Sequence, residues 1–180
     1  MAGQAQESQN SSSAPLDSVI IEGIVVNMSD GLHLQLEREG KYECLEKIMV
    51  KGGKFRVAVL PKSEEEIFRL FHYGSSATIY AKSGGRVKVY GDGNHAIRYW
   101  NIDSETFDQK ENNAYNQFAK EHVPDYYDLT DKSSLAYEKR SDESLTEEER
   151  EKATAEDRAL QEKIKAIKPK YYAALADFMK

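Results

Sequence analysis

Cysteine is scarce in this sequence: Cys44 is the only one among 180 residues. A single thiol excludes an internal disulfide, a Cys-x-x-Cys redox pair and a zinc site built from several thiolates. Long apolar runs are also missing, because Glu22 interrupts the longest one, at residues 19–26. A membrane-spanning helix needs about 20 consecutive apolar residues. We therefore expect no transmembrane segment.

Positive charge is in deficit as well. Lys and Arg number 25 against 31 Asp and Glu, which gives a net charge of −6. Proteins that bind nucleic acid neutralise its phosphates with basic patches, so this balance argues against a nucleic-acid partner. The N-terminus lacks the basic and then apolar regions of a signal peptide. Either the protein stays inside the cell or the chain begins after a removed export signal, and composition leaves both open.

The first fifteen residues have almost nothing to bury. Residues 1–15 are dominated by Gln, Ser and Asn. A segment of this composition cannot compensate for the entropy that it would lose on ordering. We therefore predict that residues 1–15 form a disordered leader, and that the folded part begins near residue 16.

Residues 16–103 show the pattern of short β-strands. Phe55, Val57 and Val59 alternate with polar residues directly after Gly52 and Gly53, which favours a tight turn and a hairpin there. Seven or eight such strands, with turns every 8–12 residues, are typical of an antiparallel β-sandwich or barrel, and we expect a small β-sandwich. The candidate strands lie at residues 19–26, 32–37, 44–50, 54–59, 67–71, 77–81, 86–90 and 97–102.

Residues 104–180 change to helical periodicity and form a helical region or linker, so the predicted fold class is α+β. One helix begins near Ser104, as its cap, and ends at Pro124, with a turn at residues 125–128. A second helix starts at the capping box of Thr146 and Glu149. It carries one apolar stripe to its end, and Pro169 predicts a kink or break in it.

No group of residues indicates catalysis, a metal or a cofactor. The four histidines lie too far apart in sequence for the paired spacing of a metal site. We expect Cys44 to be buried and inert, because carboxylates flank it rather than the cations that lower a thiol pKa. His95 lies in a Gly- and Asp-rich segment that is more typical of a turn than of a chelating loop. We therefore predict a protein that is not an enzyme.

Aromatic residues are the one feature that indicates binding. Tyr90, Tyr99 and Trp100 cluster near the end of the predicted sandwich. Exposed aromatic rings bind sugars or protein partners, because they offer a large apolar area at low entropic cost. The alternative is that Tyr99 or Trp100 seals the sandwich against the helices, whose apolar stripe must cover something. We favour the seal and keep the three residues as candidate binding residues.

The order of motifs resembles a known family. It resembles the N-terminal domain of unknown function that precedes the thioredoxin-like domain in envelope thiol–disulfide oxidoreductases of Bacteroides-type bacteria. The most specific motif is the hairpin Val50-x-x-Gly53-x-Phe55. The others are Ile21-x-Gly23, Asp30-Gly31 before Leu34 and Leu36, Gly85-x-Val87-x-Val89-x-Gly91, Glu111-Asn112-Asn113-x-x-Asn116, and a charged helix that ends in Tyr171, Leu175 and Phe178.

The resemblance implies a non-catalytic accessory domain in the periplasm or cell envelope. Such a domain positions or dimerises a redox domain, or binds a protein client, and the C-terminal helix is a possible homodimer contact. The catalytic Cys-x-x-Cys unit of the family is absent here, so no thiol–disulfide activity carries over to any residue. The alternative function is a carbohydrate- or peptide-binding module that presents Tyr90, Tyr99 and Trp100.

Overall fold

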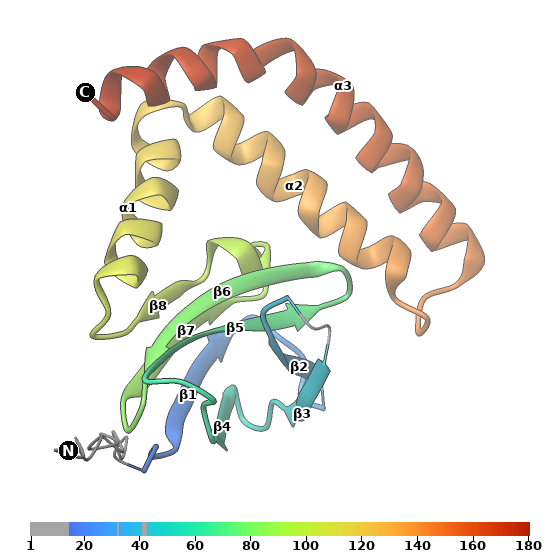
Figure 1. Cartoon of the computed structure of the whole chain (residues 1–180). Coiled ribbons are helices and arrows are strands. Elements are labelled where there is room, and N and C mark those ends of the chain that lie inside the picture. The colour runs from blue at the N-terminus through green and yellow to red at the C-terminus, as the bar shows by residue number, and fades with distance from the viewer. Residues whose placement is uncertain (1–14, 32, 41–42) are drawn as a thin grey trace, which may run out of the picture.

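The fold is α+β, as seen in the computed structural model of the chain, which describes residues 15–31, 33–40 and 43–180 (Figure 1). Eight strands form two four-stranded sheets, and three α-helices follow them. The strand number agrees with the predicted seven to eight. The disordered leader predicted at residues 1–15 lies outside the described residues, apart from Pro15.

The strands divide between two open sheets. Sheet A has the order β4-β1-β7-β8, and sheet B has the order β3-β2-β5-β6. The strands are β1 (Val19–Val26), β2 (His33–Arg38), β3 (Glu43–Met49), β4 (Lys54–Val59), β5 (Glu65–His72), β6 (Ser75–Lys82), β7 (Arg86–Asp92) and β8 (Asn101–Asp103). A short 3-10 helix, η1 (Ile97–Tyr99), precedes β8, so the last strand predicted at residues 97–102 is only partly a strand.

One strand pair departs from the predicted antiparallel arrangement. β1 and β7 pair in parallel, with Ile24 opposite Tyr90, whereas the other strand pairs of both sheets are antiparallel. The prediction is wrong at this pair because alternation of apolar and polar residues reports which face of a strand is buried. It carries no information about the direction of the neighbouring strand.

The predicted glycine turn forms, but the predicted hairpin is wrong, because the turn joins strands of two different sheets. Gly52 and Gly53 have φ values of 56° and 68°, which residues with a Cβ rarely adopt. Lys51 and Lys54 exchange two backbone hydrogen bonds of 3.0 Å across the turn. β3, before the turn, belongs to sheet B, and β4, after it, belongs to sheet A. The turn therefore connects the two sheets at one end.

One core cluster draws its residues from both sheets. Along β1 the buried residues are Val19, Ile21, Gly23 and Val25, at alternate positions on one face of the strand. In sheet B, Phe68 and Leu70 of β5 are fully buried. Burying each such side chain contributes about 1.5–3 kcal/mol, so this shared core is the main source of stability for the β region.

The edge of β6 is joined to the first helix at Tyr80. The Tyr80 amide donates a 2.9 Å hydrogen bond to Oε1 of Gln109, and its carbonyl accepts from the hydroxyls of Ser104 (2.6 Å) and Thr106 (3.2 Å). Thr106, not the predicted Ser104, is the N-cap of α1 (Phe107–His122). The Ser104 hydroxyl donates its hydrogen bond to the Tyr80 carbonyl instead. The helix therefore begins two residues later than predicted.

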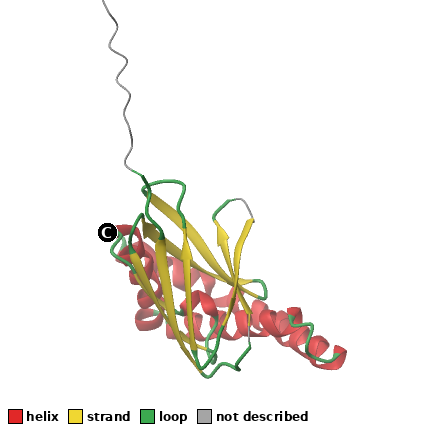
Figure 2. Cartoon of the chain, turned by 90° about the horizontal axis from the view of Figure 1, so that it is seen from below, coloured by secondary structure: helices red, strands yellow, loops and turns green. Residues whose placement is uncertain are grey.

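The helices lie together on one side of the sheets (Figures 1 and 2). α2 (Pro124–Ser141) starts directly after α1, with Pro124 in its first turn. The turn predicted at residues 125–128 is wrong, because a proline that cannot continue α1 is well suited to the first position of the next helix. α2 and α3 (Glu147–Phe178) pack against each other along their length, and α1 and α2 contact β6.

The long helix α3 packs within its own chain. Its predicted capping box is confirmed at Thr146 and Glu149. The helix continues through Pro169 without the predicted break and curves over α2 (Figure 1). Its end is held by aromatic contacts, since the Tyr171 ring stacks on Tyr126 with centroids 4.1 Å apart. None of the helices in the described ranges is both long and apolar enough to cross a membrane.

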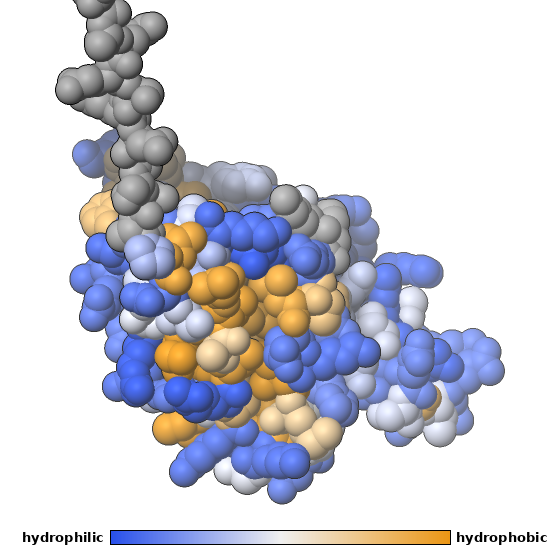
Figure 3. Space-filling view, turned by 60° about the horizontal axis from the view of Figure 1, so that its bottom comes forward, coloured by the Kyte–Doolittle hydropathy of each residue, from blue (hydrophilic) through white to orange (hydrophobic). Residues whose placement is uncertain are grey.

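The surface of the sheets away from the helices carries two features of note. Cys44 is exposed on the edge strand β3, so the predicted burial of this thiol is wrong. Its strand has only one fully buried residue, Ile48. On the outer side of sheet A, Ile24, Val26 and Tyr90 are about half exposed, and Figure 3 shows apolar residues gathered on this side of the molecule.

The Tyr80 contact gives a first test. Replacing Gln109 with alanine removes a fully buried side chain and leaves the Tyr80 amide without its acceptor. We expect Gln109→Ala to lower the free energy of unfolding by about 1–3 kcal/mol, measured by urea denaturation. Gln117→Ala, on the exposed side of the same helix, is the control and should change it by less than about 0.5 kcal/mol. Equal effects would show that the Tyr80 contact does not join α1 to β6.

Candidate functional site

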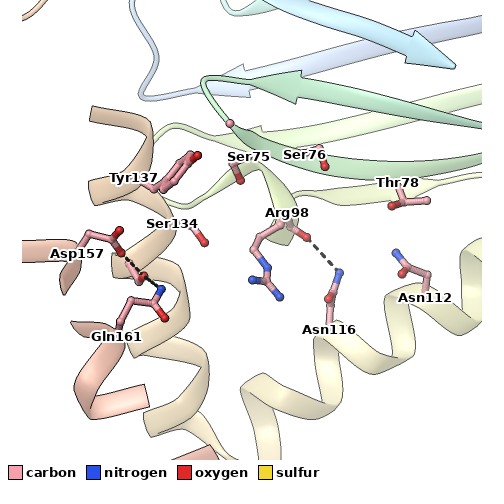
Figure 4. A pocket seen from close by; sticks show the side chains of 12 residues that line it. Ser75, Ser76, Thr78, Arg98, Asn112, Asn116, Ser134, Tyr137, Asp157 and Gln161 are labelled. Atoms are coloured by element: carbon pink, nitrogen blue, oxygen red, sulfur yellow. Dashed lines mark hydrogen bonds between the residues drawn. The ribbon is translucent and has the colours of Figure 1, made fainter. Parts of the chain in front are cut away.

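A polar cleft of about 440 Å³ lies between β6 and the three helices (Figure 4). Five elements line it, and almost every lining side chain can form hydrogen bonds. The lining residues are Gly74, Ser75, Ser76 and Thr78 of the β5–β6 turn and β6, Arg98 of η1, Asn112 and Asn116 of α1, Ser133, Ser134 and Tyr137 of α2, and Asp157 and Gln161 of α3.

The wall formed by α2 and α3 is held by its own polar contacts. The Ser133 hydroxyl donates to Oδ1 of Asp157 at 2.6 Å, and Nε2 of Gln161 donates to Ser133 at 2.7 Å. Arg140 lies 3.5 Å from the other oxygen of Asp157. The negative charge of Asp157 is therefore compensated, and this wall offers little net charge to a ligand.

The opposite side of the cleft is positioned by α1. Nδ2 of Asn116 donates a 3.3 Å hydrogen bond to the carbonyl of Arg98 and so holds η1 against the helix (Figure 4). On β6, the Ser76 hydroxyl accepts a 2.9 Å hydrogen bond from Arg69. These contacts fix the backbone on two sides of the cleft.

Arg98 supplies the uncompensated charge. Its guanidinium points into the cleft (Figure 4) and lies 5.0 Å from the centre of the Tyr99 ring. Among the described residues, no carboxylate forms an ion pair with it and no acceptor hydrogen-bonds it. Because Asp157 is compensated, the cleft carries a net positive charge.

A His–Asp pair joins the turn between β7 and η1 to α2. Nδ1 of His95 is 2.7 Å from one oxygen of Asp131, and the Ala96 amide donates to the other oxygen at 2.6 Å. Asp131 is buried on α2, so it attaches this turn to the helix. Nucleophilic catalysis requires a hydroxyl or thiol that hydrogen-bonds the other nitrogen of the histidine. In the described part of the chain, no such group hydrogen-bonds His95.

A buried carboxyl, Glu138, lines a smaller cavity of about 180 Å³. Burial raises its pKa from 4.5 to about 7, partly opposed by hydrogen bonds from the Ile97 amide and the Ser75 hydroxyl. Oε1 of Glu138 has no hydrogen-bond partner among the described residues. His72 lines the same cavity, and burial lowers its pKa. Both groups are therefore disfavoured in their charged forms.

The three aromatic residues singled out from the sequence do not share one surface. Trp100 is buried, with 5% exposure, and its ring packs against Gly91, where a Cβ would lie 2.7 Å from the ring. Tyr99 is half-buried, with its ring centroid 4.4 Å from that of Tyr127. Tyr90 is exposed on the outer side of sheet A. The burial of Trp100 and the contact of Tyr99 with Tyr127 of α2 are consistent with the interpretation that these two residues lie between the strands and the helices. The binding role of the three residues stays a prediction.

Most residues of the cleft could not be identified from the sequence. Half of the lining residues are serines and asparagines, and the other residue types each occur once. They are spread over 88 positions, from Gly74 to Gln161, with no fixed spacing. One signal was present, since Asn112 and Asn116 belong to the motif that carries the family resemblance. Among the described residues, no group of three or more His, Cys, Asp or Glu side chains is arranged to hold a metal ion.

Comparison of the sequence with known protein families finds no match, and comparison with curated proteins finds none either.

The raised pKa of Glu138 gives a second test. A carboxyl whose folded pKa exceeds its unfolded value stabilises the fold at pH values below the unfolded pKa, and this contribution is lost as the pH rises from 4.5 through about 7. The Glu138→Gln variant is uncharged at every pH. We therefore expect it to be more stable than the parent at pH 8, by on the order of 3 kcal/mol, with the difference shrinking toward pH 4.5.

Thermal and urea unfolding at several pH values measure this difference. Glu111→Gln, an exposed carboxylate on α1, is the control and should show no such pH dependence. If the stability of Glu138→Gln changed with pH in the same way as that of the parent, the conclusion that burial raises the pKa of Glu138 would be wrong.

The position of Trp100 gives a third test. It is the only tryptophan in the chain, so the emission spectrum reports on it alone. Because its ring is buried and Nε1 donates to the carbonyls of Asp92 and His95, we expect a blue-shifted emission that iodide quenches weakly. In urea the emission should shift to the red and become quenchable. Strong quenching of the folded protein would place the ring on the surface.

Proposed function

We propose that this chain is a non-catalytic binding domain and that the polar cleft holds an extended segment of a protein partner. The observation that carries the proposal is the lining of the cleft, in which five elements present hydrogen-bonding groups around about 440 Å³. Asn112, Thr78 and Ser134 have side chains with no hydrogen-bond partner among the described residues. Such groups are available to a ligand.

A polypeptide suits the cleft better than a neutral carbohydrate. Sugar sites commonly present an aromatic face for stacking. Among the described residues, the only aromatic one that lines the cleft is Tyr137, and its ring contacts Arg140 at 4.3 Å and packs against Gly74. Tyr99 and Trp100 do not line it. This argument favours the peptide-binding interpretation over the carbohydrate-binding one.

The edge of β6 supports a polypeptide further. In an antiparallel pair, alternate residues direct their backbone groups to the neighbouring strand and to the free edge. The amide and carbonyl of Tyr80 point to the free edge, so those of Thr78 and Ser76 point the same way. No backbone partner at that edge is found for them within the described chain. An extended segment can use such groups by adding to the sheet.

The domain that we propose belongs to a larger system. The family resemblance supports an accessory domain of an exported thiol–disulfide oxidoreductase-like protein, located in the periplasm or cell envelope. Its partner is then a thioredoxin-like domain or a client of that domain. We also propose that the two sheets form a β-sandwich, since one core cluster draws on both. The homodimer through α3 is not part of this proposal, because α3 packs on α2 of its own chain.

Titration of the full chain with a defined polypeptide tests the function. The probe is a reduced, carbamidomethylated and therefore unfolded polypeptide, with maltohexaose as the carbohydrate comparison. We expect the polypeptide to shift the backbone amide NMR signals of β6, η1 and α1, and the sugar to shift none. Asn112→Trp should fill the cleft and weaken binding at least tenfold.

Gln117→Trp is the matched control on the outer side of α1 and should bind like the parent. Three results would overturn the proposal: signals that shift only outside the cleft, binding of the sugar in place of the polypeptide, or vigorous reduction of insulin disulfides by the chain alone.

A further inference from the structure

The cleft has a single charged group that is free to meet a ligand. Its other charge, Asp157, lies within reach of Arg140 and accepts a hydrogen bond from Ser133. Arg98 has no carboxylate partner among the described residues and extends into the centre of the cleft (Figure 4). A guanidinium is planar and carries five N–H donors in a fork that matches the two oxygens of a carboxylate.

The surroundings of Arg98 prepare it for such a ligand. The Asn116 amide holds the Arg98 carbonyl, so the backbone that carries the guanidinium is fixed to α1. The Tyr99 ring lies beneath the guanidinium at 5.0 Å from its carbon, a contact that orients the fork without consuming its donors. Asn112 lies on the same helix one turn earlier and also lines the cleft.

We propose that the cleft recognises a carboxylate on the bound segment, with Arg98 as the residue that pairs with it and Asn112 as a further donor. This rests on the function proposed above and names the chemistry of its ligand. The carboxylate belongs either to the C-terminus of the segment or to an acidic side chain within it. Arg98 acts here as a binding residue, and no covalent step is involved.

Charge complementarity carries the choice of ligand. The chain as a whole is acidic, with a net charge of −6, so an anionic segment meets general repulsion outside the cleft. The uncompensated charge inside the cleft is positive, which makes this the place where an anionic group is favoured locally. Because Arg98 is an exposed side chain, salt should weaken the pairing.

Four synthetic peptides of one uncharged sequence separate the sources of the carboxylate. One has a free C-terminal carboxylate, a second has a C-terminal amide, and the third and fourth are amidated and carry a central Glu or a central Gln. Binding to the full chain is measured by calorimetry, and its location by amide NMR signals. We expect one carboxylate peptide, C-terminal or Glu, to bind at least tenfold more tightly than its neutral counterpart.

Arg98→Gln should abolish that preference, so that each carboxylate peptide binds no more tightly than its neutral counterpart. Arg98→Lys, which keeps the charge but loses the fork, should retain part of it. Arg56→Gln, an exposed arginine on the outer side of sheet A, is the matched control and should retain the full preference. Raising the salt concentration should lower the preference in the parent chain.

The outcomes distinguish the two proposals. If carboxylate and neutral peptides bind equally tightly in the cleft, carboxylate recognition is overturned and the binding function stands. If Arg98→Gln weakens all four peptides alike, carboxylate recognition is also overturned. If none of the four peptides binds and the unfolded polypeptide does not bind either, both proposals fail together.

Discussion

The backbone of Tyr80, on the edge of the sheet, is the constraint on which the arrangement of this chain depends. An unpaired amide and carbonyl at a covered strand edge cost free energy unless other groups satisfy them. Gln109, Ser104 and Thr106 do so from the start of α1. The same contacts fix where α1 begins and therefore where α2 and α3 can lie. Earlier in β6, at Ser75, Ser76 and Thr78, the cleft lies between the strand and the helices.

A second set of contacts closes the other end of the helical region. Asp131 holds the turn around His95 and Ala96, and Glu138 reaches between Ser75 and Ile97. Both acids come from α2, so this helix is attached to β6, to the β7–η1 turn and to α3. The cleft is therefore bounded by elements that are each tied to a neighbour by a polar contact. Contacts that fix the elements around a cleft lower the ordering cost of binding a ligand there.

The sequence predicted most of the elements but missed α2, and it predicted which elements lie next to each other poorly. Alternation and glycine turns located seven strands and part of the eighth, and the Thr146–Glu149 pattern located the start of α3, because these signals are local. Strand direction at Ile24 and Tyr90 depends on contacts between distant segments, and no local pattern encodes it. The cleft was missed for the same reason: its lining brings Arg98 together with residues of α1, α2 and α3 that are distant in sequence. Cys44 was misplaced because flanking residues do not reveal that a strand lies at an edge.

The parallel pairing of β1 with β7 has a consequence for how the chain acquires its structure. The two central strands of sheet A are separated by about sixty residues, whereas β5 and β6 of sheet B are joined by a tight turn. Closing a long loop costs entropy before any contact offsets it, and distant pairings slow folding. During synthesis, the β5–β6 hairpin can therefore form before β7 is available to pair with β1. Sheet A, whose last strand is β8, is completed only after residue 103 has left the ribosome.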